Sequence, residues 1–196
     1  VSRMKLSGPV PIAGSFYCAY ASSMREVYMP PGLLGEDGFL RAMLVTNCFR
    51  ESVDDKKVIR AKNASHYYET LTTLKGIFQH ELRLKIGTAQ NCYLCWDLLH
   101  LATDPNGTGA GVTIRNRIAH DPNWYHRAID NAIRNHGWWV LPRGMLLGRF
   151  SNMKFKSDIK EKLKTLLVSL AAFPFDLVVL LTANRKLKQS TMIGYW

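Results

Sequence analysis

Gly35-Glu36-Asp37-Gly38-Phe39-Leu40-Arg41-Ala42-Met43 is the stretch that decides which fold we expect for this chain. It places two adjacent carboxylates at the start of an amphipathic helix. A helix start tolerates negative charge because its free N–H groups and its dipole point toward that charge. We therefore expect Glu36 to hold the helix start while Asp37 faces a cleft and accepts a proton. The alternative is ordinary helix capping by both side chains.

The composition of the chain permits a packed core and favours an anionic partner. The chain has 196 residues, of which 47% are hydrophobic, and its formal net charge is +11. That length suits one domain or a small domain with an appendage. The positive charge favours nucleic acid, an anionic membrane or a phosphorylated substrate. Cys92 and Cys95 have redox or half-zinc spacing, but two buried thiols in a helix are the more common explanation.

Periodicity predicts both helices and strands. Apolar residues at helical spacing indicate helices over 38–48, over 70–101 and from Asp121 to about residue 136. Short apolar or aromatic runs indicate strands at 16–20, 58–61 and 138–141. A Gly-rich linker is expected at 103–109.

The apolar stretch from Leu166 to Ala183 is marginal for spanning a membrane. Its 18 residues would extend about 27 Å as a helix, against a bilayer core of about 30 Å. Pro174 and Asp176 lie near its middle, and basic residues flank both ends. We expect a helix that is broken at Pro174 and either lies at an anionic membrane interface or re-enters the membrane. A buried pair of core helices is the alternative.

Other residues suggest binding chemistry. His66 is a candidate ligand for a metal or a phosphate, and a structural hydrogen bond is its alternative. His80 and Arg83 lie one helical turn apart, where Arg83 could neutralise a pyrophosphate; a solvated basic face is the alternative. Gly14-Ser15 precedes a predicted strand and could let a ligand approach the backbone closely.

Taken in order, these segments resemble the C-terminal half of bacterial, membrane-associated family 2 glycosyltransferases. The resemblance lies in the Gly-loop and strand at 14–20, Leu-Gly-Glu-Asp-Gly-Phe at 34–39, the strand ending near Ala61 and the helix from Gln79 to Gly87. Later stretches that look similar are Asp121-Pro-Asn-Trp, Trp139-Val-Leu-Pro-Arg-Gly and the final Gly-Tyr-Trp.

The resemblance implies an α/β fold: a partial GT-A-like, Rossmann-like half domain over 1–102. A basic accessory unit over 103–158 and membrane-associated C-terminal helices over 159–196 would follow. The implied activity is inverting transfer of a sugar from a nucleotide-sugar to an acceptor hydroxyl, at the cytoplasmic face of the cell membrane. Asp37 matches the catalytic base of this family's acidic pair, and Glu36 is its partner.

The implied binding residues match the family less completely. His66 matches a metal or phosphate histidine. The segment 80–84 stands where the family has Gln-x-x-Arg-Trp, and only the arginine of that motif is retained, as Arg83. His80 stands in the place of the glutamine. Alternatively, the alignment is shifted by one residue and Gln79 is the functional glutamine. Gly14 and Ser15 would approach the substrate phosphates.

The family's Asp-x-Asp metal motif does not occur in this sequence. We therefore expect a divalent cation, Mg²⁺ or Mn²⁺, whose site is completed by residues outside this chain. The partner would be a missing N-terminal half or a separate subunit, and the chain alone would be inactive.

A basic, non-enzymatic binding module is the other hypothesis. Its anionic partner would be a membrane or nucleic acid, although we consider nucleic acid the weaker possibility. Trp138 and Trp139 would offer stacking surfaces, and the cations would be arginines, namely Arg115, Arg117, Arg127, Arg134 and Arg143.

Overall fold

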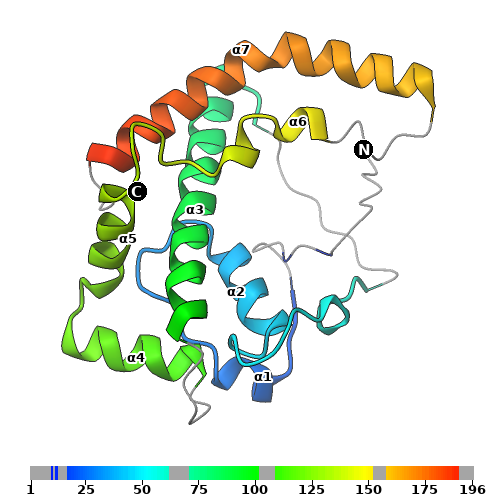
Figure 1. The fold of residues 1–196 in the computed structure, drawn as a ribbon. Coiled ribbons are helices and arrows are strands. Elements are labelled where there is room, and N and C mark those ends of the chain that lie inside the picture. The colour runs from blue at the N-terminus through cyan, green and yellow to red at the C-terminus, as the bar shows by residue number, and fades with distance from the viewer. Residues whose placement is uncertain are drawn as a thin grey trace.

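The described part of the protein is built from helices. The computed structural model describes residues 10, 12, 17–61, 71–101, 109–151 and 158–189. Its α-helices are α1 (Ala21–Arg25), α2 (Glu36–Val45), α3 (Leu74–Leu101), α4 (Ala110–His120), α5 (Trp124–Arg134), α6 (Gly148–Ser151) and α7 (Ile159–Gln189); two short 3-10 helices, η1 (Asp55–Lys57) and η2 (Arg143–Met145), complete the set (Figure 1).

The predicted α/β fold is wrong for these residues, because none of them forms a strand. A strand is stable only when a neighbouring strand takes up its backbone hydrogen bonds and one face packs on a core. Tyr17–Tyr20 precedes α1 as exposed irregular chain, and residues 58–61 are also irregular, with Ile59 80% exposed. The described residues therefore give no partial GT-A-like, Rossmann-like half domain.

The third predicted strand, 138–141, is an irregular connection, exposed at Trp138 and buried at Val140 and Leu141, whose backbone bonds to side chains. The Val140 N–H donates to Asn184 Oδ1 at 2.7 Å, and the Val140 carbonyl accepts from the Tyr93 hydroxyl at 2.6 Å. Val140 and Leu141 are both buried. The predicted strand is therefore wrong here, because helix side chains supply the hydrogen bonds that a neighbouring strand would have supplied.

Helix α3 is the central element, and α2, α5 and α7 all pack on it (Figure 1). Its buried side chains recur at helical intervals and include Leu82, Ile86, Ala89, Leu94 and Leu98. Each fully buried leucine or isoleucine contributes about 1.5–3 kcal/mol relative to an exposed one. The predicted helix over 70–101 is thus confirmed from Leu74 onward.

Helix α2 confirms the helix predicted over 38–48 as far as Val45, begins two residues earlier at Glu36, and ends in an unusual turn. Asn47, Cys48 and Phe49 all have positive φ, at 50°, 57° and 62°. Such a left-handed run of residues other than glycine is strained. Two hydrogen bonds help to hold it: the Phe49 N–H donates to Thr46 Oγ1 at 2.9 Å, and the Cys48 carbonyl accepts from the Ala110 N–H at 3.0 Å. The second bond joins this turn to the start of α4.

Helix α5 begins slightly later than the sequence predicts. The Asp121 carboxylate accepts from the Asn123 N–H at 3.1 Å, and the Asp121 carbonyl accepts from the Trp124 N–H at 2.9 Å. Asp121 therefore organises the turn before the helix, as expected of this residue type. The helix ends at Arg134, three residues before Gly137.

Helix α7 is continuous, so the predicted break at Pro174 is wrong. Pro174 lies inside the 31-residue helix, which is bent along its length in Figure 1. A proline removes one helical hydrogen bond and favours a bend without requiring that the helix end. Burial is concentrated toward the C-terminal part of α7, where Val179, Leu180, Ala183 and Leu187 are buried.

Buried residues from all three predicted units belong to one hydrophobic cluster. The cluster includes Phe39 and Ile86 from the first unit, Ile129 from the second and Leu180 from the third. The boundaries 1–102, 103–158 and 159–196 stay a prediction about organisation, but the described parts of these ranges share a core.

Candidate functional site

The acidic turn, which we define as residues 32–38, is held by backbone contacts with α3 and α5. Gly32 and Gly35 have φ values of 76° and 77°, a left-handed conformation that glycine adopts without strain. Leu33 and Leu34 between them are buried. The Tyr125 hydroxyl donates to the Gly32 carbonyl at 3.1 Å, and the Asn91 amide donates to the Gly35 carbonyl at 2.6 Å.

Gly87 of α3 lets the acidic turn approach the helix backbone. A Cβ atom at position 87 would lie 2.6 Å from the Leu34 carbonyl oxygen and 3.0 Å from the Gly35 nitrogen. Both are backbone atoms that cannot rotate away. The absence of a side chain at Gly87 is therefore a requirement for this contact, and Gly87 and Asn91 together fix where α2 begins.

The acidic pair occupies the first turn of α2, as predicted. Glu36 is exposed and Asp37 is half-buried. Free backbone N–H groups at a helix start stabilise charged carboxylates there. The two carboxylates therefore have different surroundings, and Asp37 is less exposed to solvent than Glu36.

His80 and Arg83 lie on the face of α3 that receives the acidic turn. Arg83 precedes Gly87 by four residues, which is one turn or about 6 Å along the helix, and His80 precedes it by two turns. Both side chains are exposed, as is that of Gln79. The structure therefore places these predicted phosphate-binding residues along the same side of α3 as the acidic turn, with their side chains in solvent.

Three predicted site residues, Gly14, Ser15 and His66, lie outside the described residues. In the part of the chain that is described, no three His, Cys, Asp or Glu side chains come together as a metal site. Two neighbouring carboxylates do not complete the ligand set of a divalent cation. The described residues thus do not fit a Mg²⁺ or Mn²⁺ ion, and we derive no chemical step through one.

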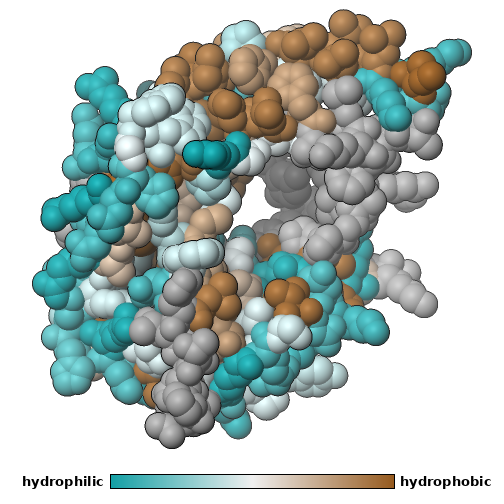
Figure 2. Space-filling model, viewed as in Figure 1, coloured by the Kyte–Doolittle hydropathy of each residue, from teal (hydrophilic) through white to brown (hydrophobic). Residues whose placement is uncertain are grey.

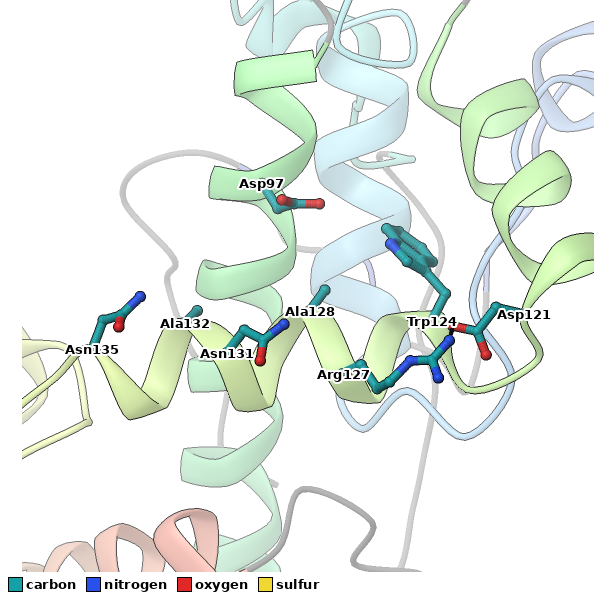
Figure 3. A pocket seen from close by; sticks show the side chains of 8 residues that line it. All are labelled: Asp97, Asp121, Trp124, Arg127, Ala128, Asn131, Ala132 and Asn135. Carbon is teal, nitrogen blue, oxygen red and sulfur yellow. Dashed lines mark ion pairs between the residues drawn. The ribbon is translucent and has the colours of Figure 1, made fainter.

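A shallow pocket with a volume of about 500 Å³ lies between α3 and α5 and contains none of the residues predicted for the glycosyl-transfer site (Figure 3). Its polar side chains come from Asp97 of α3, from Asp121, and from Arg127, Asn131 and Asn135 of α5. In Figure 3 the amides of Asn131 and Asn135 point to the same side of α5 as Asp97. The spacing of four residues between the asparagines was the only sequence signal for this pocket, and it is a weak one.

Ion pairs already neutralise both carboxylates of this pocket. Asp121 pairs with Arg127, and Asp97 pairs with Arg117 at 3.3 Å. The Arg117 guanidinium also lies 5.0 Å from the centre of the Trp124 ring, within cation–π range. These contacts stabilise the packing of α4 and α5 on α3 and give a structural reason for the charged residues at this position.

The same ion pairs bear on the nucleic-acid hypothesis. Two of its five arginines, Arg117 and Arg127, are engaged with carboxylates. Trp138 is 74% exposed, and its ring meets that of Trp139 edge-on, with centroids 5.5 Å apart. Of the two predicted stacking residues, Trp138 is the one that is mostly exposed, and a single-strand binding surface commonly stacks successive bases on several aromatic side chains.

The Cys92–Cys95 pair lies within α3. Cys95 is half-buried and Cys92 is exposed, so the expected pair of buried thiols is wrong for Cys92. Loss of solvent around the thiol, and secondarily the neighbouring Cys92, raise the pKa of Cys95 to about 12, and partial loss of solvent also raises the pKa of Cys92. A thiol reacts or binds metal as the thiolate, so these values favour inert, protonated side chains at neutral pH.

Among the described residues, α7 is one helix that is long and apolar enough, by length and composition, to cross a membrane. Most of its apolar window is not buried inside the protein. No family model matches the chain, and none of the curated proteins or solved structures compared with it matches either.

Proposed function

We propose that this chain contributes the acceptor side of a glycosyl-transfer site, with Asp37 as the base that takes a proton from the acceptor hydroxyl. The observation that carries the proposal is the construction of the acidic turn. Gly87 and Asn91 of α3 contact the backbone of the turn and so fix where α2 begins relative to α3. A general base must be held within hydrogen-bond reach of its proton, which requires this kind of support.

Glu36 and Asp37 have different roles in this proposal. Glu36, the more exposed residue, stabilises and is stabilised by the free N–H groups of the helix start. Asp37, half-buried beside it, accepts the hydroxyl proton as the acceptor oxygen attacks the sugar carbon and the nucleoside diphosphate leaves.

Arg83 and His80 would face the diphosphate. They lie on the α3 face that receives the acidic turn, one and two turns before Gly87. A guanidinium binds phosphate oxygens through two parallel hydrogen bonds, and Arg83 is exposed and available to do so. The rest of the donor site, including any divalent cation, would come from residues beyond those described here or from a partner polypeptide.

The proposed location is the cytoplasmic face of the cell membrane, with α7 as the attachment. The apolar length of α7 and the basic residues at its two ends support attachment. Attachment near the membrane would suit an acceptor carried by a lipid.

The test is transfer of radiolabelled sugar from a panel of nucleotide-sugars to membrane acceptors, in membranes from cells that produce the protein with its natural partners. We expect Asp37→Asn to lower transfer by about 10²- to 10⁴-fold, because the amide cannot accept the proton. Glu36→Gln is the matched control, since it removes a neighbouring carboxylate whose role is electrostatic, and it should retain a larger share of activity. Near-normal transfer by a folded Asp37→Asn variant would remove Asp37 as the base.

A basic binding module is the second candidate, and the 74% exposure of Trp138 is the observation that favours it. Binding of single-stranded nucleic acid that weakens steeply with salt and is lost in Trp138→Ala would support this candidate.

A further inference from the structure

Helix α7 carries a continuous apolar surface on the side away from the core. We call the side chains of this surface the outer stripe. Each is between 47% and 79% exposed, and they recur every three, four or eight residues. They are Ile159, Leu163, Leu167, Leu170, Val178 and Leu181. With 100° of rotation per residue, they fall within an arc of about 100°. In Figure 2 hydrophobic residues gather along α7 across the top of the molecule. The stripe is about 33 Å long at 1.5 Å per residue.

The C-terminal part of α7 packs on the rest of the protein through the side opposite the outer stripe. Val179, Leu180 and Leu187 are buried in the shared core. Asn184, 8% exposed, accepts from the Val140 N–H at 2.7 Å and donates to the Trp138 carbonyl at 2.9 Å. From residue 179 onward, α7 therefore packs one face on the core and leaves the outer stripe exposed on the opposite side.

Basic residues stand at both ends of the outer stripe. Within α7 there are six basic and two acidic side chains; the basic ones are Lys160, Lys162, Lys164, Arg185, Lys186 and Lys188. On the helical wheel Lys160, Arg185 and Lys188 lie in the same arc as the stripe. A long basic side chain beside an apolar surface suits a headgroup region, where the stem packs on acyl chains and the charge reaches phosphate.

We infer that the outer stripe docks α7 in the plane of an anionic lipid bilayer, with its apolar side chains at the boundary between headgroups and acyl chains. A second copy of this chain would cover the outer stripe less favourably than a bilayer. Its Lys160–Lys164 and Arg185–Lys188 ends would meet like charge in either orientation of two paired helices. An anionic surface instead complements both ends at once.

The same packing opposes a helix that spans the bilayer. Helix α3 is attached to α7 through the Phe78 and Phe175 rings, whose centroids lie 6.1 Å apart. If α7 crossed the membrane with this contact intact, the exposed His80 and Arg83 of α3 would be drawn toward the hydrocarbon, at a cost of several kcal/mol. The in-plane orientation keeps them in water. This inference does not require Asp37 to act on a sugar.

The experiment is flotation of the purified protein with vesicles of phosphatidylcholine, alone or mixed with phosphatidylglycerol. Wild type should float with the anionic vesicles. Leu167→Glu should weaken this binding by about tenfold or more, because a charged side chain replaces a leucine that enters the interface. Val168→Glu is the matched control: Leu167 is 60% and Val168 58% exposed, but Val168 lies off the stripe, so its effect should be small.

Orientation is read by adding trypsin outside sealed vesicles. An in-plane helix leaves the lysines of both ends accessible, whereas a spanning helix would leave one end protected until detergent is added. Failure of wild type to float, equal losses in Leu167→Glu and Val168→Glu, or one protected end would each overturn the inference. So would a concentration-dependent dimer without lipid that Leu167→Glu abolishes and Val168→Glu does not. None of these readouts measures sugar transfer, so failure here and failure of the proposed activity are distinguishable.

Discussion

Gly87 is the residue at which α3 and the acidic turn come closest. The Leu34 carbonyl oxygen occupies the space that a Cβ atom would need, at 2.6 Å. Asn91, one turn further along α3, donates to the Gly35 carbonyl and keeps the turn in register. The position of Asp37 therefore depends on a glycine and an amide that are far from it in the sequence.

The substitution Gly87→Ala tests this dependence. We expect a loss of about 1–3 kcal/mol in the free energy of unfolding, because the backbone of the acidic turn must move to admit the methyl group. Urea unfolding monitored by circular dichroism measures the change. Gly144→Ala is the control, since nothing lies within 4 Å of the added Cβ and little change is expected there. Equal stability of the two variants would contradict the close contact.

At the scale of elements, α7 is joined to the core by Asn184 as well as by apolar packing. The Asn184 amide satisfies two backbone groups of the connection after α5, the Val140 N–H and the Trp138 carbonyl. Lys188 adds a bond to the Gly137 carbonyl at 3.3 Å. These bonds replace the pairing that a neighbouring strand would give to 138–141.

Replacing Asn184 by alanine should therefore destabilise the protein by about 2–4 kcal/mol, since two backbone groups lose their partner. The adjacent change Arg185→Ala alters an exposed side chain and should stay within about 0.5 kcal/mol of wild type. Thermal or urea unfolding distinguishes the two. A neutral Asn184→Ala would mean that water or a rearranged chain satisfies these groups equally well.

Helical periodicity predicted α2, α3 and α5 well, because each buries one face and the spacing of apolar residues reports that face directly. Strands were not predictable in this way. An apolar run such as 138–141 indicates burial, but whether a strand or a side chain supplies its hydrogen bonds depends on residues distant in sequence, here Tyr93 and Asn184. The close approach at Gly87 and the continuity of α7 through Pro174 were missed for the same reason, since both depend on packing partners.

The whole molecule is organised around one hydrophobic cluster that includes buried hydroxyl and thiol groups. Burial raises the pKa of Tyr125 to about 12, and burial followed by the nearby Cys92 raises that of Cys95 to about 12. The ordinary values are 10.0 and 9.0. At pH values between the ordinary and the raised pKa, the folded protein holds protons that the unfolded chain has released.

Stability should consequently fall as the pH rises from about 9 toward 12, and these groups should contribute no such loss below that range. Tyr125→Phe should weaken the dependence above pH 10, since the phenol no longer titrates, and should cost about 1 kcal/mol at neutral pH through the lost bond to Gly32. Urea unfolding across this pH range is the measurement. Tyr20→Phe, at an 84% exposed tyrosine, should leave the curve unchanged; a similar response in both variants would contradict the assignment.

The crossing of α3 and α7 sets a distance between any surface that holds α7 and the carboxylates of α2. Phe78 touches Phe175 of α7, and Gly87, where the acidic turn docks, is nine residues further along α3, or about 14 Å. Because both contacts, Phe78 with Phe175 and Gly87 with the acidic turn, are packed, rotating a single helix does not shorten this separation. If α7 lies on a bilayer and Asp37 acts as proposed, a lipid-borne acceptor must carry its hydroxyl roughly 14 Å beyond the contact between α3 and α7, measured along α3.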